Sequence, residues 1–186
     1  MRTIRSGGRR LPAVVAGAVS LVSGLVSGLG FPSAASAQVE PNLLVQFADW
    51  GTYLATPGGK KVCYALSKPT TSKTEPAGRK RDQPFMLISN RPAESVRNEV
   101  SLIIGYPFKP NSDAIAEIGT AKFVMQTQND GAWFKSVAED ARFVDAMRKG
   151  ADATVKGMSG RGTATVDQFS LKGLSQALDR ADRECK

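Results

Sequence analysis

Residues 153–169 read ATVKGMSGRGTATVDQF, in which apolar or β-branched residues alternate with polar ones on both sides of a glycine-containing centre. Alternation with a period of two is typical of a half-buried β-strand. Met158, Ser159, Gly160 and Arg161 have the composition of a turn. The segment therefore predicts two strands, at residues 153–157 and 162–169, connected by a turn.

The same pattern extends outward from this pair of strands. Turn signals such as Asn129-Asp130-Gly131 separate the segments. Residues 67–83 contain two prolines and no large apolar residue, and they are predicted to form a long exposed loop. Extended structure is predicted at residues 47–54, 62–66, 85–88, 100–106, 115–127 and 132–134.

Two segments change from a period of two to a period near 3.6 and predict helices. The first follows Ser136, which forms a capping box with Glu139, and it ends at Gly150. The second covers residues 171–184 and turns an apolar face inward. Many short strands with two helices predict an all-β fold, a β-sandwich with two short helices, the last one C-terminal.

The N-terminal 37 residues have the features of a secretory signal peptide. Four arginines, an apolar run at residues 11–29 and the small residues Ala35 and Ala37 occur in the order that a signal peptidase requires. An uncleaved membrane anchor is the alternative, but glycine and serine residues dilute the hydrophobicity of the run. We expect a signal peptide at residues 1–37, a single domain at residues 38–186 beginning with Gln38, export from the cytoplasm and no transmembrane anchor after cleavage.

The composition limits the chemistry that the protein can perform. The chain contains no histidine, which excludes Ser-His-Asp and Cys-His catalytic centres and histidine-ligated zinc. We predict no catalytic residue, no cofactor and no metal site. The two cysteines, Cys63 and Cys185, are predicted to form one structural disulfide in an oxidising compartment.

The net charge of +8 overstates how basic the exported domain is. The leader carries four arginines and no acidic residue, so its removal lowers the charge to +4. Between Tyr64 and Phe85 there is no aromatic residue that could stack on bases. Nucleic acid is therefore not an expected partner.

Residues 60–81 form a strongly basic stretch, in which seven lysines and arginines accompany only Glu75. Within it, Lys73, Arg79, Lys80 and Arg81 are the candidate anionic-ligand loop, with phosphorylated glycolipid such as lipopolysaccharide as the expected ligand. A solvated loop without a binding function is favoured over a binding site, because charge runs on long loops usually only keep them in water.

A hydrolase without histidine is a further alternative. Thr70 and Lys73 have the spacing of a Thr-x-x-Lys dyad, but a polar loop would not lower the lysine pKa. Ser159 does not fit a nucleophile elbow, because arginine replaces the last glycine of that motif.

Short motifs throughout the domain resemble the invasion-associated locus B family. The resemblance implies an immunoglobulin-like sandwich in the periplasm or at the outer membrane of a Gram-negative bacterium, without known catalytic residues. It also implies a non-enzymatic protein that binds an unknown envelope or host protein and contributes to host-cell interaction or envelope maintenance. The motifs are FADW (47–50), VCYA (62–65), DGAW (130–133), AMRKG (146–150), VKG (155–157), RGT (161–163), SLKG (170–173) and the final Cys185.

Overall fold

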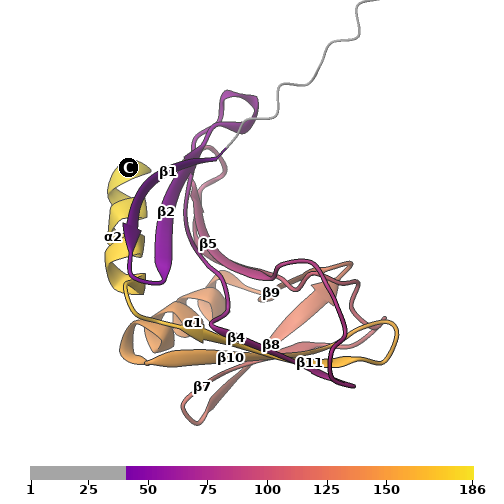
Figure 1. The fold of residues 1–186 in the computed structure, drawn as a ribbon. Helices are drawn as coiled ribbons and strands as arrows, with labels where there is room; N and C mark the ends of the chain where they lie inside the picture. The colour runs from indigo at the N-terminus through magenta and orange to yellow at the C-terminus, as the bar shows by residue number, and fades with distance from the viewer. Residues whose placement is uncertain (1–40) are drawn as a thin grey trace, which may run out of the picture. The chain divides into compact units, whose positions relative to one another are not determined.

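The computed structural model describes residues 41–186, which form eleven β-strands and two α-helices (Figure 1). The predicted signal peptide and its cleavage site lie outside the described residues. None of the helices within the described residues is long and apolar enough to cross a membrane. The strands are β1 (Asn42–Phe47), β2 (Trp50–Ala55), β3 (Val62–Ser67), β4 (Thr71–Glu75), β5 (Phe85–Arg91), β6 (Val96–Ile103), β7 (Ala114–Ile118), β8 (Ala121–Gln128), β9 (Gly131–Trp133), β10 (Asp152–Met158) and β11 (Ala164–Ser170).

All the strand pairs are antiparallel, and their hydrogen-bonded order is β1-β2-β3-β5-β6-β9-β8-β7-β10-β11-β4. The first half of this order runs from β1 to β9, and the second half runs from β7 to β4. Strand β8 connects the two halves, because residues 121–125 pair with β7 and residues 126–128 pair with β9. In Figure 1 the strands β1, β2 and β5 run across the direction of β4, β10 and β11. The prediction of a mostly β fold is confirmed. The immunoglobulin-like arrangement stays a prediction.

Alternating side chains from both halves build one core. Met86 and Leu102 come from the first half, Val155 and Phe169 come from the second, and all four are buried. This is the period-two pattern expected of strands that present one face to a core. Burial of such side chains supplies most of the folding free energy, at about 25 cal/mol per Å² of apolar surface.

Helix α1 (Val137–Lys149) begins as the sequence predicts. The Ser136 hydroxyl accepts a hydrogen bond from the Glu139 backbone N–H at 3.3 Å. Phe143 and Met147 are buried on the inner face of the helix. The helix is fixed to β6 by Asp140, whose carboxylate accepts the Val100 N–H at 2.9 Å.

Helix α2 (Leu174–Glu184) is the C-terminal helix, and it begins three residues later than predicted. The start is set by Gly173, which has a left-handed φ of +87°. A Cβ atom at this position would lie 1.9 Å from the carbonyl oxygen of Phe47. Only glycine permits both this conformation and this close approach.

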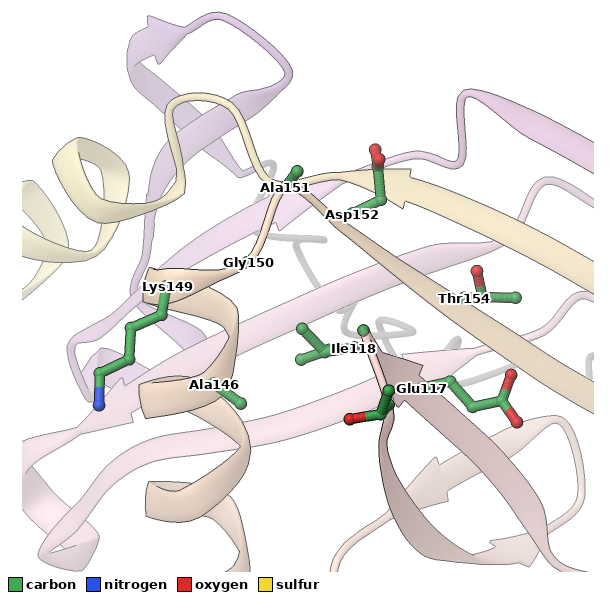
Figure 2. Close-up of a pocket in the computed structure, with 10 residues that line it drawn as sticks. Glu117, Ile118, Ala146, Lys149, Gly150, Ala151, Asp152 and Thr154 are labelled. Atoms are coloured by element: carbon green, nitrogen blue, oxygen red, sulfur yellow. The ribbon is translucent and has the colours of Figure 1, made fainter.

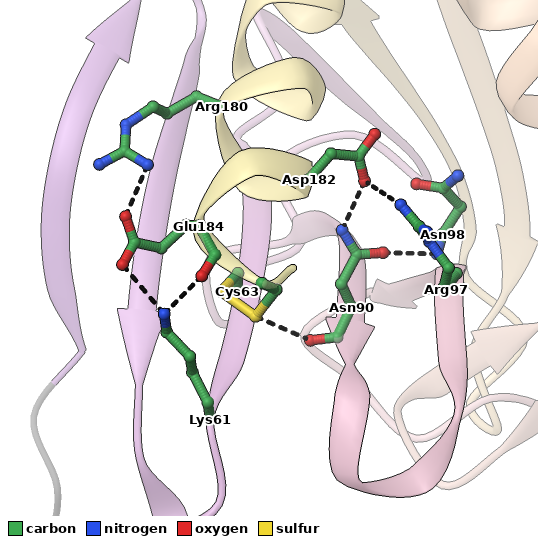
Figure 3. The surroundings of a disulfide bond; sticks show 9 residues. Lys61, Cys63, Asn90, Arg97, Asn98, Arg180, Asp182 and Glu184 are labelled. Carbon is green, nitrogen blue, oxygen red and sulfur yellow. Dashed lines mark hydrogen bonds and ion pairs between the residues drawn. A yellow bond between two sulfur atoms is a disulfide. The ribbon is translucent and has the colours of Figure 1, made fainter.

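A disulfide between Cys63 of β3 and Cys185 ties the end of α2 to the first half of the sheet, as the sequence predicts (Figure 3). Polar contacts surround it: Lys61 pairs with Glu184 at 3.2 Å, and the Asn90 amide donates to Asp182 at 2.8 Å. Further along the helix, the Thr52 hydroxyl donates to the Ala177 carbonyl at 3.0 Å. The helix is therefore held at both its middle and its end.

The prediction of one long exposed loop at residues 67–83 is wrong. Thr71–Glu75 form β4, which pairs with β11 at the edge of the order, with Lys73 opposite Val166. An edge strand of this kind can be polar on both faces, so its sequence lacks the apolar alternation that reveals a strand. The predicted strand at residues 100–106 also ends early, because the chain turns at Gly105, where φ is +81°.

Candidate functional site

A pocket of about 540 Å³ opens where the segment after β4 meets the turn between β10 and β11. Figure 1 shows these two connections at the same end of the second half of the sheet. The pocket combines charged, hydroxyl and aromatic side chains. Its lining residues are Thr74, Arg79, Lys80, Arg81, Asp82, Gly105, Tyr106, Pro107, Ser159, Gly160, Arg161, Thr163 and Thr165.

One wall is the turn between β10 and β11, which its own hydrogen bonds hold in place. The Gly162 N–H donates to the Ser159 carbonyl at 2.9 Å, and the Ser159 hydroxyl accepts the Thr163 N–H at 3.0 Å. The Gly160 N–H donates to the carbonyl of Pro107 at 3.0 Å. These bonds fix the backbone on both sides of Arg161, which is exposed.

A second wall is anchored by an ion pair between Arg81 and Asp167. The Arg81 side chain is 9% exposed and Asp167 of β11 is fully buried. Arg81 also donates to the Ile104 carbonyl at 2.8 Å, and the Ser72 hydroxyl donates to Asp167 at 2.7 Å. The ion pair fixes the chain at residue 81. The exposed residues Arg79 and Lys80 are therefore attached to a fixed position.

The same wall is also held next to the ion pair, where Asp82 passes close to Gly105, two residues after the end of β6. The Asp82 N–H donates to the Gly105 carbonyl at 3.1 Å. A Cβ atom at residue 105 would lie 2.1 Å from the Asp82 carbonyl oxygen, so this crossing requires glycine.

The third wall is apolar and formed by Tyr106 and Pro107. The Tyr106 and Thr165 hydroxyls lie 2.6 Å apart in a hydrogen bond, and burial raises the pKa of Tyr106. The Arg81 guanidinium lies over the Tyr106 ring, 5.7 Å from its centroid. Tyr106 is therefore rigidly placed and uncharged at neutral pH.

The four cations of the candidate loop occupy different positions. Arg79 and Lys80 are exposed and line the pocket. Arg81 lines it as well, but its charge is neutralised by Asp167. Lys73 does not line the pocket, because successive strand residues point to opposite faces and its neighbour Thr74 faces the pocket.

Arg161 is the pocket cation that sequence reasoning missed. Its segment was interpreted only as a turn and as a failed nucleophile elbow. An arginine between two glycines in a predicted turn is a signal of an exposed charge. Nothing in the sequence placed this turn beside residues 79–82.

A second cavity, of about 610 Å³, lies beside the end of α1 (Figure 2). It is lined by two acidic residues, Glu117 and Asp152, and Glu117 is paired with Lys156 at 2.6 Å and with Lys122 at 3.6 Å. The hydrogen bond from Lys156 is the main reason that the Glu117 pKa lies below its ordinary value. In Figure 2 Lys149 points away from Asp152 and Thr154, so the polar groups of this cavity do not converge.

Hydroxyl groups that a hydrolase would need are engaged elsewhere. Thr70 donates to the Gln168 carbonyl at 3.0 Å rather than toward Lys73. The Ser159 side chain is buried and bonded within its own turn. Among residues 41–186 no group of three or more Cys, Asp or Glu side chains could hold a metal ion.

These features define a class of protein: a disulfide-bonded, mostly β domain with a basic pocket at one end of its sheet. A family model described as Invasion associated locus B (IalB) protein matches residues 50–182. The chain belongs to this family. No curated protein matches the chain, and no solved structure matches it.

Proposed function

We propose that this protein is an exported, non-enzymatic component of the cell envelope that binds an anionic group of its ligand in the basic pocket. The observation that carries this proposal is the convergence of Arg79, Lys80 and Arg161 on one cavity from two segments about 80 residues apart in sequence. The periplasm is the proposed location, since a disulfide persists in an oxidising compartment.

The charge balance of the pocket favours an anion. Arg81 and Asp167 neutralise one another, which leaves three cations and the single carboxylate of Asp82. Arginine guanidinium groups bind phosphate or carboxylate oxygens in pairs, and lysine adds a point charge. Because the cations lie around a cavity rather than on a flat surface, they can contact one bound group together.

The proposal of a non-enzymatic role rests on what the pocket lacks and on how its hydroxyls are used. The sequence contains no histidine, and both cysteines are in the disulfide. The Tyr106, Thr165 and Ser159 side chains are held by one another or by the backbone. No base lies in hydrogen-bond contact with these hydroxyls among the described residues, so none of them is activated as a nucleophile.

A phosphorylated glycolipid such as lipopolysaccharide is the proposed ligand. The test uses protein recovered from cells that express the full chain, and vesicles of neutral phospholipid with or without lipid A. The triple change Arg79→Ala, Lys80→Ala, Arg161→Ala should weaken binding to lipid A vesicles about tenfold or more and reduce its dependence on salt. Arg142→Ala, an exposed cation of α1, is the matched control. Equal binding by the triple variant and the parent at low salt would refute the proposal.

Binding of an envelope or host protein is the second candidate function. The observation in its favour is that β1 and β4 stand at the two ends of the strand order, so each has one side without a strand partner among the described residues. Extended peptides bind such edges. Crosslinking in intact envelopes followed by purification would recover one protein in defined ratio if this is correct, and glycolipid alone if it is not.

The predicted leader has its own test. Removal of residues 1–37 on export would leave a protein that begins with Gln38. Intact-mass measurement of protein from the periplasmic fraction should give the mass of residues 38–186. A full-length mass in the inner membrane would contradict both the cleavage and the location.

A further inference from the structure

Asp82 is an acidic side chain in a pocket whose other free charges are positive. It is exposed and lines the pocket beside Arg79 and Lys80. Among the described residues its carboxylate makes no ion pair within 4 Å and no hydrogen bond, although its backbone is fixed by Gly105. A free carboxylate next to three free cations weakens the attraction of the pocket for a bare anion.

A carboxylate in that position can bind a ligand that carries hydrogen-bond donors as well as a negative charge. An ionised carboxylate only accepts hydrogen bonds, and its best neutral partners are hydroxyl groups. Two hydroxyls that line the pocket are bonded to groups other than Asp82: Thr165 is bonded to Tyr106, and the Thr74 hydroxyl accepts the Arg79 N–H at 3.2 Å. The exposed Asp82 carboxylate is therefore open to hydrogen-bond donors that a ligand brings.

The size and apolar wall of the pocket indicate the rest of the ligand. A volume of about 540 Å³ lies within the range of small-molecule sites and exceeds what a bare phosphate group fills. Tyr106 and Pro107 add carbon atoms to the lining of the pocket. A sugar ring has an apolar face for such a wall and hydroxyls at its rim.

We propose that the pocket recognises a phosphate monoester carried on a sugar, and this inference rests on the proposed function of the pocket as an anion site. Arg79, Lys80 and Arg161 bind the phosphate, Asp82 accepts hydrogen bonds from sugar hydroxyls, and Tyr106 with Pro107 contacts the ring. Free sugar phosphates and the phosphorylated sugar head group of a glycolipid share this chemistry.

The test is isothermal titration of protein recovered from cells that express the full chain, with inorganic phosphate, glucose and glucose 1-phosphate as probes. Glucose 1-phosphate should bind about tenfold tighter than inorganic phosphate, because one charged acceptor adds hydrogen bonds of its own. Asp82→Asn should change the two affinities in opposite directions. Phosphate should bind more tightly because a repulsive charge is lost, and glucose 1-phosphate should bind about tenfold more weakly because a charged acceptor is lost. Asp145→Asn makes the same charge change on α1 and should alter neither.

The outcomes separate this inference from the proposed function. If Asp82→Asn strengthens phosphate and glucose 1-phosphate alike, sugar recognition is refuted while the anion site stands. If neither phosphate probe responds to the triple change at Arg79, Lys80 and Arg161, the anion site itself is refuted. Competition between glucose 1-phosphate and lipid A vesicles identifies the source: displacement supports a glycolipid head group, and tight binding of glucose 1-phosphate without displacement supports a free sugar phosphate.

Discussion

Arg81 and Asp167 form an ion pair almost completely removed from solvent, although 86 residues separate them in the sequence. Asp167 lies on β11, and Arg81 belongs to the connection between β4 and β5. One carboxylate oxygen, Asp167 Oδ2, is buried without a hydrogen-bond partner in the described part of the chain. The pair thus supports the pocket wall at a cost in desolvation, and its loss from one side would leave a buried charge uncompensated.

Arg81→Met should therefore destabilise the protein strongly. Removal of one member of a buried pair typically costs about 3–5 kcal/mol in the free energy of unfolding. Arg79→Met is the matched control, because Arg79 is exposed and such substitutions usually change stability by less than about 0.5 kcal/mol. Urea denaturation measures both variants. Equal midpoints for the two variants would show that the Arg81–Asp167 pair does not anchor the wall.

Asp140 makes stability depend on pH in a direction that can be stated in advance. Burial is the largest cause that raises its pKa above the ordinary value of 3.8, and the hydrogen bond from the Val100 N–H opposes this only in part. A group whose pKa is higher in the folded state contributes stability below its unfolded pKa, and this contribution is lost as the pH rises through the folded pKa.

Asp140→Asn keeps an acceptor for the Val100 N–H but does not titrate. The stability of this variant relative to the parent should therefore increase as the pH rises from 3.8 through the raised pKa of Asp140. Asp140→Ala, which lacks the acceptor, should be less stable than Asp140→Asn at every pH. Urea denaturation across this pH range tests both statements. A constant difference between parent and Asp140→Asn would show that the pKa of Asp140 is the same in the folded and unfolded states.

Local patterns along the chain were enough to predict most of the strands and one helix start. Ser136 and Glu139 lie within one helical turn, so their capping interaction is visible in the sequence. The cysteine pair was also predictable, because two cysteines allow only one intramolecular pairing. Each of these features depends on a short pattern or on a count.

Strand β1 was missed, and strands β7 and β8 were predicted as one segment. The other features that were missed depend on tertiary contacts. The edge strand β4 has the sequence TSKTE, which has no apolar side to reveal it. Arg81 resembles its exposed neighbours Arg79 and Lys80, and only the position of Asp167 makes it different. Arg161 joins the same pocket because β10 and β11 bring their turn beside residues 79–82. The sequence thus predicted a basic site for an anion, but it did not predict which residues form that site.

The disulfide should contribute substantially to stability. Cys63 and Cys185 are 122 residues apart, and the chain-entropy model gives about 4–5 kcal/mol for a loop of this size. Reduction should lower the Tm of the parent and leave the Tm of the double variant Cys63→Ala, Cys185→Ala unchanged. Thermal melts with and without reductant measure this difference. A covalent dimer of the parent on a non-reducing gel would contradict the intramolecular pairing.

The close crossing of Gly105 and Asp82 links backbone geometry to ligand binding. Gly105→Ala would place a Cβ atom 2.1 Å from the Asp82 carbonyl oxygen and would also strain a left-handed φ, so the segment carrying Arg79 and Lys80 must move. Both the Tm and the affinity for lipid A vesicles should fall. Gly119→Ala is the matched control, because Gly119 also has a left-handed φ, of +56°, but nothing lies within 4 Å of its added Cβ. This control should lose stability by about 1 kcal/mol and keep its affinity. If Gly105→Ala loses stability to the same extent as Gly119→Ala and binds lipid A vesicles like the parent, the position of residues 79–82 does not determine anion binding.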